Sequence, residues 1–280
     1  MLVLGVVLAS TLALANKKLY VYEDPRIDVV EDMLPRANCG ACGVAGCRAF
    51  AEAVVAGELS PSKCTSNSTE MTHTIAEYLG VEVTVEEKRV ARLACAGGNH
   101  VAWTRAHYEG MVQTCRAAAL AGGGGKECVW GCLGLGECAD ACTFDAITMS
   151  KQGLPVVDVE KCTACGDCVE ACPRDLFSIH PISHRLWVAC KNQLMGEEAE
   201  RQCEVACTGC GRCEMDAAPG LVSIVDNLAV VNYEHNGKAD PKAIQRCPTG
   251  AIVWLDDEGG ATKGTAAKRI ARERRLPVRV

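Results

Sequence analysis

The 280-residue chain has few residues from which to build a deep hydrophobic core. Phenylalanine, tyrosine and tryptophan together make up only 4% of it, whereas cysteine occurs 20 times. A chain of this length suggests roughly two domains, and small modules held together by metal can be more numerous. With so few large apolar side chains, we expect much of the stability to come from thiolate–metal bonds.

The chain also lacks the motifs of nucleotide-binding and hydrolytic enzymes. No G-x-G-x-x-G follows a predicted strand, and the glycines before Lys126 do not form a phosphate-binding loop, because their spacing differs and Glu127 replaces the required serine or threonine. Neither a catalytic triad nor a pair of carboxylates stands out, and the six histidines have no paired spacing. We therefore predict no catalytic side chains and no dinucleotide site.

Long hydrophobic runs are missing as well. Leu2 to Ala15 is uncharged and mostly apolar, but it is shorter than the roughly 20 residues that span a bilayer. Lys17 and Lys18 follow, and by the positive-inside rule they would hold the remainder in the cytoplasm. We predict a short membrane anchor over residues 1–18. A secretory signal peptide ending at Ala15 is the alternative, which the lack of a preceding basic residue disfavours.

Cysteine, in contrast, is abundant and has iron–sulfur spacing. One unbroken C-x2-C-x2-C-x3-C-P run ends at Pro173 and contains Cys162, Cys165, Cys168 and Cys172. In this motif three thiolates hold one [4Fe–4S] cluster and the fourth ligates its partner cluster. Thiolate ligation needs reduced cysteines, so this motif places the clusters in the cytosol.

A second run lies upstream, with Leu135 in place of its second cysteine. It keeps Cys132, Cys138 and Cys142, and Cys128 is the candidate replacement ligand. Exchange of the fourth ligands then predicts two clusters, one held by Cys128, Cys132, Cys138 and Cys172 and the other by Cys142, Cys162, Cys165 and Cys168. Residues 126–182 would form a two-cluster ferredoxin module.

Two further runs are incomplete in a coordinated way. One has Ala217 at its fourth position, and the other keeps only its last cysteine, with Gly237, Asp240 and Ala243 at the other positions. All four missing ligands belong to one cluster. The surviving ligands form the complementary set Cys207, Cys210, Cys213 and Cys247. We predict a degenerate ferredoxin module with one cluster within residues 183–256.

The remaining motif lies near the N-terminus and contains Cys39, Cys42, Cys47 and Cys64. Its glycines would let backbone amides approach cluster sulfurs closely. We predict an N-terminal [4Fe–4S] domain over residues 19–85. Tetrahedral zinc also suits distant pairs of cysteines, and a disulfide scaffold would suit 20 cysteines, although disulfides need no ferredoxin spacing.

Four cysteines have no motif: Cys95, Cys115, Cys190 and Cys203. We expect four clusters in all, or five if these cysteines also hold iron. Cys203 precedes Cys207 as Cys128 precedes Cys132, so either could ligate its own module. Buried free thiols that pack as small hydrophobes are an equally good interpretation.

Local signals predict an α+β fold made of a short N-terminal membrane helix, a small cluster-binding helical domain and tandem ferredoxin-like modules. Asp24 and Pro25 would begin a helix that runs to about Leu34, and a second would run from Cys47 to Ala56. Hairpins are predicted from residues 146–149 with 155–159 and from 222–225 with 228–232. Residues 86–125 read as a linker or small α/β segment.

The C-terminal tail, residues 257–280, is basic. From Lys263 onward the net charge is +6, so the preceding residues carry −12. Such a tail is expected to behave separately, either binding anionic lipid or an acidic partner or remaining a solvated end. No aromatic residues interleave with these charges, so we predict no nucleic-acid binding.

Several segments resemble the B component of the Rnf electron-transport complex. At the start these are Lys17-Lys18, Asp24-Pro25-Arg26, Leu34-Pro35 and Asn38 to Cys47; later they are CVWGCLGLGECADAC from Cys128 to Cys142, Phe144 to Ile147 and Gly153 to Asp158. The later segments are similar to the longer, multi-ferredoxin form of that component. The chain departs from that pattern at Thr143, where proline is expected, and in its incomplete last run.

The resemblance implies an electron-relay subunit attached to the inner (cytoplasmic) membrane, with its bulk on the cytoplasmic side. It would accept electrons from soluble reduced ferredoxin and pass them to other Rnf subunits, which reduce NAD with translocation of Na+ or H+. The set from Cys39 to Cys64 would be the family's N-terminal cluster domain. A polyferredoxin of another membrane reductase, such as one that reduces a redox-sensing regulator, is the alternative.

Overall fold

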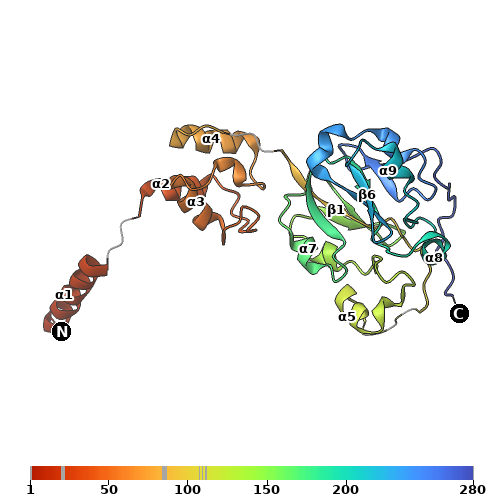
Figure 1. Ribbon diagram of the computed structural model, residues 1–280. Helices are drawn as coiled ribbons and strands as arrows, with labels where there is room; N and C mark the ends of the chain where they lie inside the picture. The colour runs from red at the N-terminus through yellow and green to blue at the C-terminus, as the bar shows by residue number, and fades with distance from the viewer. Residues whose placement is uncertain are drawn as a thin grey trace. The chain divides into compact units, whose positions relative to one another are not determined.

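The computed structural model describes residues 2–19, 23–83, 87–106, 108, 110 and 112–279. The chain forms two compact units, residues 1–86 and 87–280 (Figure 1). The division falls next to the predicted boundary between residues 85 and 86, and that boundary itself lies outside the described residues.

The first unit is helical. Its elements are α1 (Leu2–Leu19), α2 (Pro25–Asp32), α3 (Cys47–Val55), the 3₁₀ turn η1 (Pro61–Lys63) and α4 (Thr69–Leu79). The predicted cap of α2 is confirmed, since the Arg26 amide donates to Asp24 Oδ1 at 2.9 Å. Val30, Phe50 and Ile75 are fully buried and join α2, α3 and α4 in one apolar core. This core positions the loops that carry the first cysteine set.

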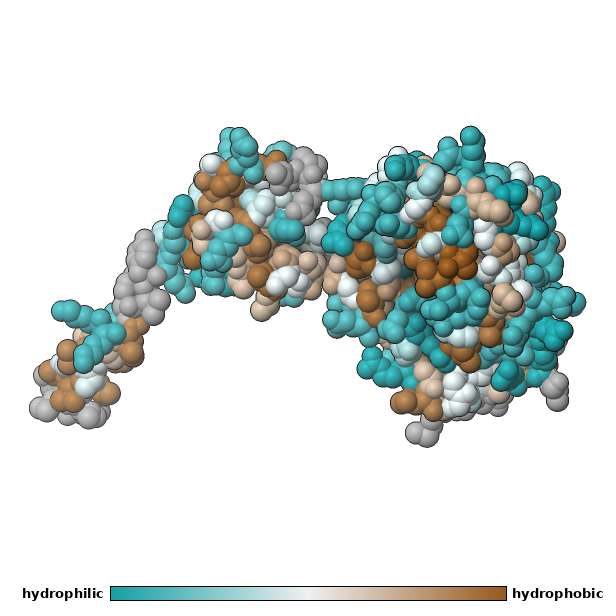
Figure 2. All heavy atoms as spheres, viewed as in Figure 1, coloured by the Kyte–Doolittle hydropathy of each residue, from teal (hydrophilic) through white to brown (hydrophobic). Residues whose placement is uncertain are grey.

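Helix α1 coincides with the predicted short membrane anchor, residues 1–18, and the structure does not confirm that prediction. Its apolar side chains are exposed, as the brown atoms along it show in Figure 2, and its last turn contains Lys17 and Lys18. Among the described residues, we find no helix with both the length and the apolar character needed to cross a bilayer.

The second unit consists of small antiparallel sheets connected by short helices. Three sheets have two strands each: β1 (Arg89–Leu93) with β4 (Phe177–Pro181), β2 (Ile147–Met149) with β3 (Pro155–Val157), and β6 (Val222–Val225) with β7 (Leu228–Val231). The fourth has three strands, with β8 (Ile252–Leu255) between β5 (Leu186–Val188) and β9 (Ala261–Lys263). The helices and turns are α5 (Cys115–Leu120), η2 (Gly123–Gly125), α6 (Glu137–Asp140), α7 (Asp167–Ala171), α8 (Gly196–Gln202), α9 (Arg212–Asp216), η3 (Tyr233–Lys238) and η4 (Pro241–Ile244). Both predicted hairpins, β2–β3 and β6–β7, are confirmed.

Residues 86–125, predicted as a linker or small α/β segment, contribute a strand that pairs within the predicted first ferredoxin module, residues 126–182. Strand β1 pairs with β4 from Arg89 opposite Pro181 to Leu93 opposite Phe177. Ala91 on β1 is buried with Cys138 and Cys168 in the core of that module. The two strands are far apart in sequence, so no local signal marks their pairing.

The basic tail also packs on the second unit and does not form a separate segment. Strand β9 extends the β5–β8 sheet, and Leu276 is buried with its amide donating to the Asn99 carbonyl at 2.9 Å. Arg272 pairs with Glu204 at 2.6 Å, and the Arg279 guanidinium lies 4.4 Å from the Trp103 ring centroid. Part of the positive charge of the tail is therefore paired within the chain.

A glycine substitution tests this packing. A Cβ at Gly264 would lie 1.9 Å from the Ile244 carbonyl oxygen, which is backbone and cannot rotate away. We expect Gly264→Ala to lower the free energy of unfolding by about 3 kcal/mol, because overpacking forces backbone shifts. Gly237→Ala is the matched control, since its Cβ would meet nothing within 4 Å. Anaerobic urea unfolding followed by circular dichroism would measure both, and equal stability would contradict the packing of the tail.

Candidate iron–sulfur sites

The first unit brings its four predicted ligands around one loop. Cys39 and Cys42 lie before α3, Cys47 begins α3, and Cys64 follows η1. Burial, together with the neighbouring charges of Cys42 and Cys39, raises the pKa of Cys64 to about 11. The loop is tightly packed, because the Cys47 amide donates to Asn38 Oδ1 at 2.9 Å and a Cβ at Gly46 would lie 2.8 Å from that oxygen. These four thiols can therefore bind one cluster or metal ion together.

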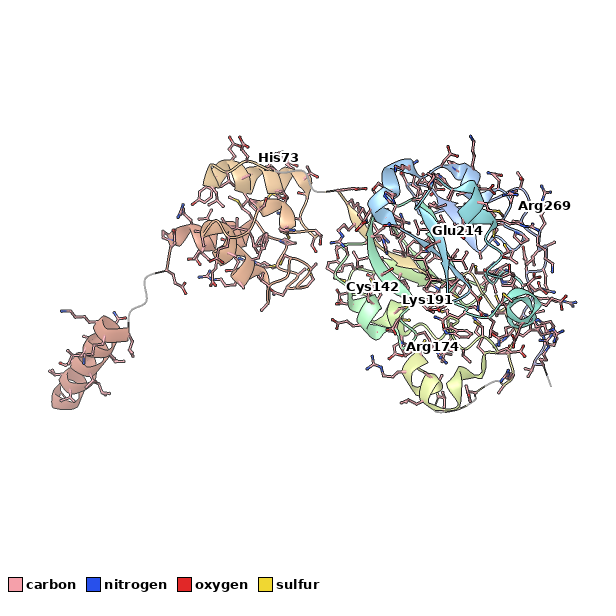
Figure 3. The ribbon with its side chains drawn as sticks, in the orientation of Figure 1. His73, Cys142, Arg174, Lys191, Glu214 and Arg269 are labelled. Carbon is pink, nitrogen blue, oxygen red and sulfur yellow. The ribbon has the colours of Figure 1, made fainter. Side chains whose placement is uncertain are left out.

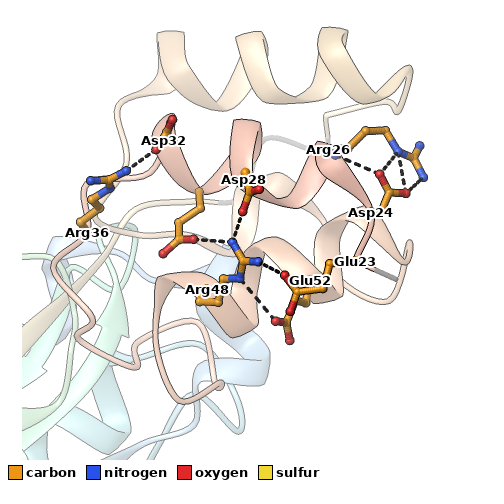
Figure 4. Close-up of polar contacts among 9 residues, drawn as sticks. Glu23, Asp24, Arg26, Asp28, Asp32, Arg36, Arg48 and Glu52 are labelled. Atoms are coloured by element: carbon orange, nitrogen blue, oxygen red, sulfur yellow. Dashed lines mark hydrogen bonds and ion pairs between the residues drawn. The ribbon is translucent and has the colours of Figure 1, made fainter. Parts of the chain in front are cut away.

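An ion-pair network fixes α3 beside this loop. Arg48, directly after Cys47, pairs with Glu31 at 2.8 Å and with Glu23 at 2.6 Å, and it also pairs with Asp28 (Figure 4). Hydrogen bonds to Asp28 and Glu31 raise the pKa of Arg48 above its usual range. The network joins α2 to the ligand-bearing end of α3.

The second unit brings together the predicted set Cys142, Cys162, Cys165 and Cys168. Cys168 is buried on α7, which raises its pKa to about 12, and the charges of the other three thiols contribute to the increase. Cys142, labelled in Figure 3, follows α6. The Ala91 amide on β1 lies 3.4 Å from Cys162 Sγ and donates to it. Such amide–sulfur bonds favour the thiolate form that iron requires.

The set Cys207, Cys210, Cys213 and Cys247 also comes together, next to the β6–β7 hairpin. Burial, together with the charges of the other three thiols, raises the pKa of Cys213 to about 12. Cys207, Cys213 and Cys247 pack in a core with Leu186 and Leu221. The sequence predicted these four residues as the surviving ligands of one cluster, and they are neighbours in the structure.

The structure differs from the prediction for the upstream run. Cys132, Cys138 and Cys172 line one cavity, and the fourth cysteine that lines it is Cys115. Burial, together with the charges of Cys115 and Cys172, raises the pKa of Cys138 to about 11. Cys115 begins α5, outside any cysteine motif. Arg174, which also lines this cavity, is labelled in Figure 3.

Cys128, predicted to complete that set, lines a different cavity. Its cysteine neighbours there are Cys95, Cys190 and Cys203. The structure therefore places Cys128 apart from the Cys132 set, with which it was predicted to lie. Cys128 was chosen because it is the cysteine nearest to Cys132 along the chain. In the folded protein, Cys115 at the start of α5 lines the cavity of Cys132 instead. In the sequence, the only indication that Cys95, Cys115, Cys190 and Cys203 could be ligands is that they are the four cysteines outside the motifs.

The chemistry of the donor sets fits iron–sulfur clusters. Four cysteine thiols line each of the two cavities, and Glu137 also lines the cavity of Cys132. Within the part of the chain that the structure describes, no three His, Cys, Asp or Glu side chains lie close enough to hold a single metal ion. A four-iron cluster separates its thiolates, because each sulfur binds a different iron, whereas zinc draws four ligands to one centre at about 2.3 Å from sulfur.

A buried arginine lies beside the set that contains Cys162. Arg92 on β1 is 6% exposed, and its Nε and Nη2 atoms have no hydrogen-bond partner. Burial lowers its pKa, while the charges of Tyr233 and Cys162 oppose that shift. Arginine stays protonated in proteins, so a positive charge is held close to this cysteine set.

Two family descriptions match parts of this site. One, "Putative Fe-S cluster", covers residues 34–66 and includes the first cysteine set; the other, "4Fe-4S binding domain", covers residues 155–177 and includes Cys162 to Cys172. Together with the small hairpin sheets, these matches define an iron–sulfur protein with 4Fe–4S-binding modules.

Relatives extend the comparison to nearly the whole chain. The B component of the Na+-translocating ferredoxin:NAD+ oxidoreductase complex of Acetobacterium woodii is 38% identical over 93% of this chain and 78% of its own length. The B component of the ion-translocating oxidoreductase complex of Methanosarcina acetivorans is 37% identical over 89% and 94%. The B component of the proton-translocating ferredoxin:NAD+ oxidoreductase complex of Clostridium ljungdahlii is 37% identical over 90% and 89%. The chain belongs to this family, the B components of Rnf complexes.

Proposed function

We propose that the chain is the electron-relay subunit of an Rnf-type ferredoxin:NAD oxidoreductase. It accepts electrons from soluble reduced ferredoxin and passes them through [4Fe–4S] clusters to other subunits, which reduce NAD with translocation of Na+ or H+. The observation that carries this proposal is the grouping of cysteines into sets of four within a chain of this family. The absence of a dinucleotide motif assigns NAD reduction to another subunit.

We assign four clusters to the following ligands: Cys39, Cys42, Cys47 and Cys64; Cys115, Cys132, Cys138 and Cys172; Cys142, Cys162, Cys165 and Cys168; and Cys207, Cys210, Cys213 and Cys247. The second set replaces Cys128 by Cys115 because the two cysteines line different cavities. The high pKa values of the buried thiols mean that iron must displace protons as each cluster forms.

We propose that the chain works at the cytoplasmic side of the inner membrane, within the assembled complex. Reduced thiolates support a cytosolic position for the clusters. The exposed apolar side chains of α1 support contact of this helix with the membrane or with a membrane subunit. A polyferredoxin of another membrane reductase remains the second candidate, and co-purifying subunits would separate the two.

Rapid mixing with ferredoxin tests the relay. We expect a reduced 2[4Fe–4S] ferredoxin to bleach the visible absorbance of the anaerobic chain, since each electron taken up reduces a cluster. NADH should not bleach the isolated chain, because it has no nucleotide site. Stopped-flow absorbance measures both reactions. An iron-loaded chain that takes no electrons from ferredoxin, or takes them directly from NADH, would contradict the proposal.

A further inference from the structure

The cavity lined by Cys95, Cys128, Cys190 and Cys203 is formed by four separate parts of the second unit. Cys95 follows β1, Cys128 follows η2, Cys190 follows β5 and Cys203 follows α8. Cys128 and Cys203 are 7% and 5% exposed. Cys203 Sγ and Cys95 Sγ would lie 3.0 and 3.6 Å from a Cβ added at Gly97, so two of the sulfurs converge on this glycine.

Hydrogen-bond donors surround these sulfurs. The Asn192 amide donates to Cys190 Sγ at 3.4 Å, and its side-chain Nδ2 lies 3.6 Å from Cys128 Sγ. Asn192 is 1% exposed, so its side chain amide lies inside the protein next to these sulfurs and not in solvent. Lys126 lines the cavity, and its ammonium donates to the Cys132 carbonyl at 2.7 Å. Amide donors and one cation offset the negative charge that four thiolates bring to a cluster.

Two of these sulfurs also touch ligands of neighbouring sets. The Cys132 amide donates to Cys95 Sγ at 3.4 Å, and the Cys207 amide donates to Cys190 Sγ at 3.3 Å. Cys132 belongs to the first ferredoxin module and Cys207 to the second. The cavity therefore lies between two proposed clusters, one hydrogen bond from a ligand of each.

We propose that Cys95, Cys128, Cys190 and Cys203 bind a fifth [4Fe–4S] cluster, which conducts electrons between the two ferredoxin modules. The inference rests on the proposed relay function. Each step moves one electron: the donor cluster is oxidised by one electron, the acceptor cluster is reduced by one, and no bond is made or broken. Electron transfer slows steeply with distance, so a cluster between the two modules would divide the path between their clusters into two shorter steps.

Iron analysis of double variants tests the ligand set in the full-length chain. With five clusters we expect about 20 iron and 20 sulfide per chain. Cys95→Ala and Cys203→Ala should each lose about four iron, and the double variant the same four, because both residues serve one cluster. Cys95→Ala with Cys128→Ala should also lose only four. Cys95→Ala with Cys115→Ala is the matched control, and it should lose about eight.

Three results would overturn the fifth site. A parent with about 16 iron that is unchanged by Cys95→Ala would remove the site while leaving the relay intact. Loss of a further four iron when Cys128→Ala is added to Cys95→Ala would return Cys128 to another cluster. Zinc without sulfide at this position would replace the cluster with a single ion. A colourless parent would instead contradict the relay function itself.

Two further readouts do not depend on iron counts, and the first of them also leaves every cysteine in place. Asn192→Leu keeps all four thiols but removes the donor to Cys128, so redox titration followed by electron paramagnetic resonance should show one cluster shifted to lower potential. Unchanged potentials would contradict the site. After freeze-quench mixing of Cys203→Ala with reduced ferredoxin, the clusters of one module should fill at least tenfold more slowly than in the parent. If the clusters of both modules are reduced as fast as in the parent, the proposed electron transfer through the fifth cluster is contradicted.

Discussion

Removal of iron is expected to unfold residues 87–280. Cys207, Cys213 and Cys247 are themselves part of a buried core, and the small sheets contain few aromatic residues to replace them. Metal ligation by four-ligand structural zinc sites contributes about 10–16 kcal/mol in small domains, whereas the net stability of a domain is about 5–15 kcal/mol. Loss of even one site in this unit therefore removes free energy comparable to its entire stability.

The measurement is thermal unfolding followed by circular dichroism, before and after anaerobic iron removal with the thiols kept reduced. The iron-free chain should show no cooperative transition for the second unit. Reconstitution with iron and sulfide is the control and should restore the transition. An iron-free chain that still melts cooperatively near the temperature of the loaded protein would show that the apolar cores suffice without clusters.

Replacement of Arg92 by methionine is expected to lower the reduction potential of the cluster bound by Cys142, Cys162, Cys165 and Cys168. Arg92 is buried beside Cys162 with Nε and Nη2 unpartnered, so its charge is poorly screened. Two unit charges about 8 Å apart interact by about 2 kcal/mol at an effective dielectric constant of about 20. For a one-electron couple this corresponds to about 90 mV.

Redox titration of the loaded chain, followed by electron paramagnetic resonance, measures the shift. Arg92→Lys is the matched control, because it keeps the positive charge and should keep most of the potential. The methionine variant should be at least as stable as the parent, since a buried charge without full pairing is costly. A potential that is equal in Arg92→Met and Arg92→Lys would contradict an electrostatic role for Arg92.

Local chemistry explains which parts of the fold the sequence could predict. The α2 cap depends on Asp24 and Pro25 alone, and the β6–β7 hairpin on alternating apolar residues around Asp226 and Asn227, both of which have positive φ. Closely spaced cysteines likewise lie near one another where they belong to one loop and one helix, as Cys207, Cys210 and Cys213 do.

The features that the sequence could not predict depend on contacts between distant segments. Cys115 lines the same cavity as Cys132, although the spacing between the two matches no cluster motif. Cys95 and Cys190 line one cavity although they are far apart in the sequence, because β1 and β5, which precede them, fold into the same unit. The tail was expected to be separate on the basis of its charge. Its packing depends on the burial of Leu276 and on ion pairs such as Arg272 with Glu204, which charge counting does not reveal.

Iron, acid-labile sulfide and zinc per chain after strictly anaerobic purification test the central claim most directly, because all 20 cysteines are assigned to four-iron clusters. We predict about 20 iron and about 20 sulfide, with little zinc. A folded, colourless chain that contains zinc and almost no sulfide would contradict the electron-relay account.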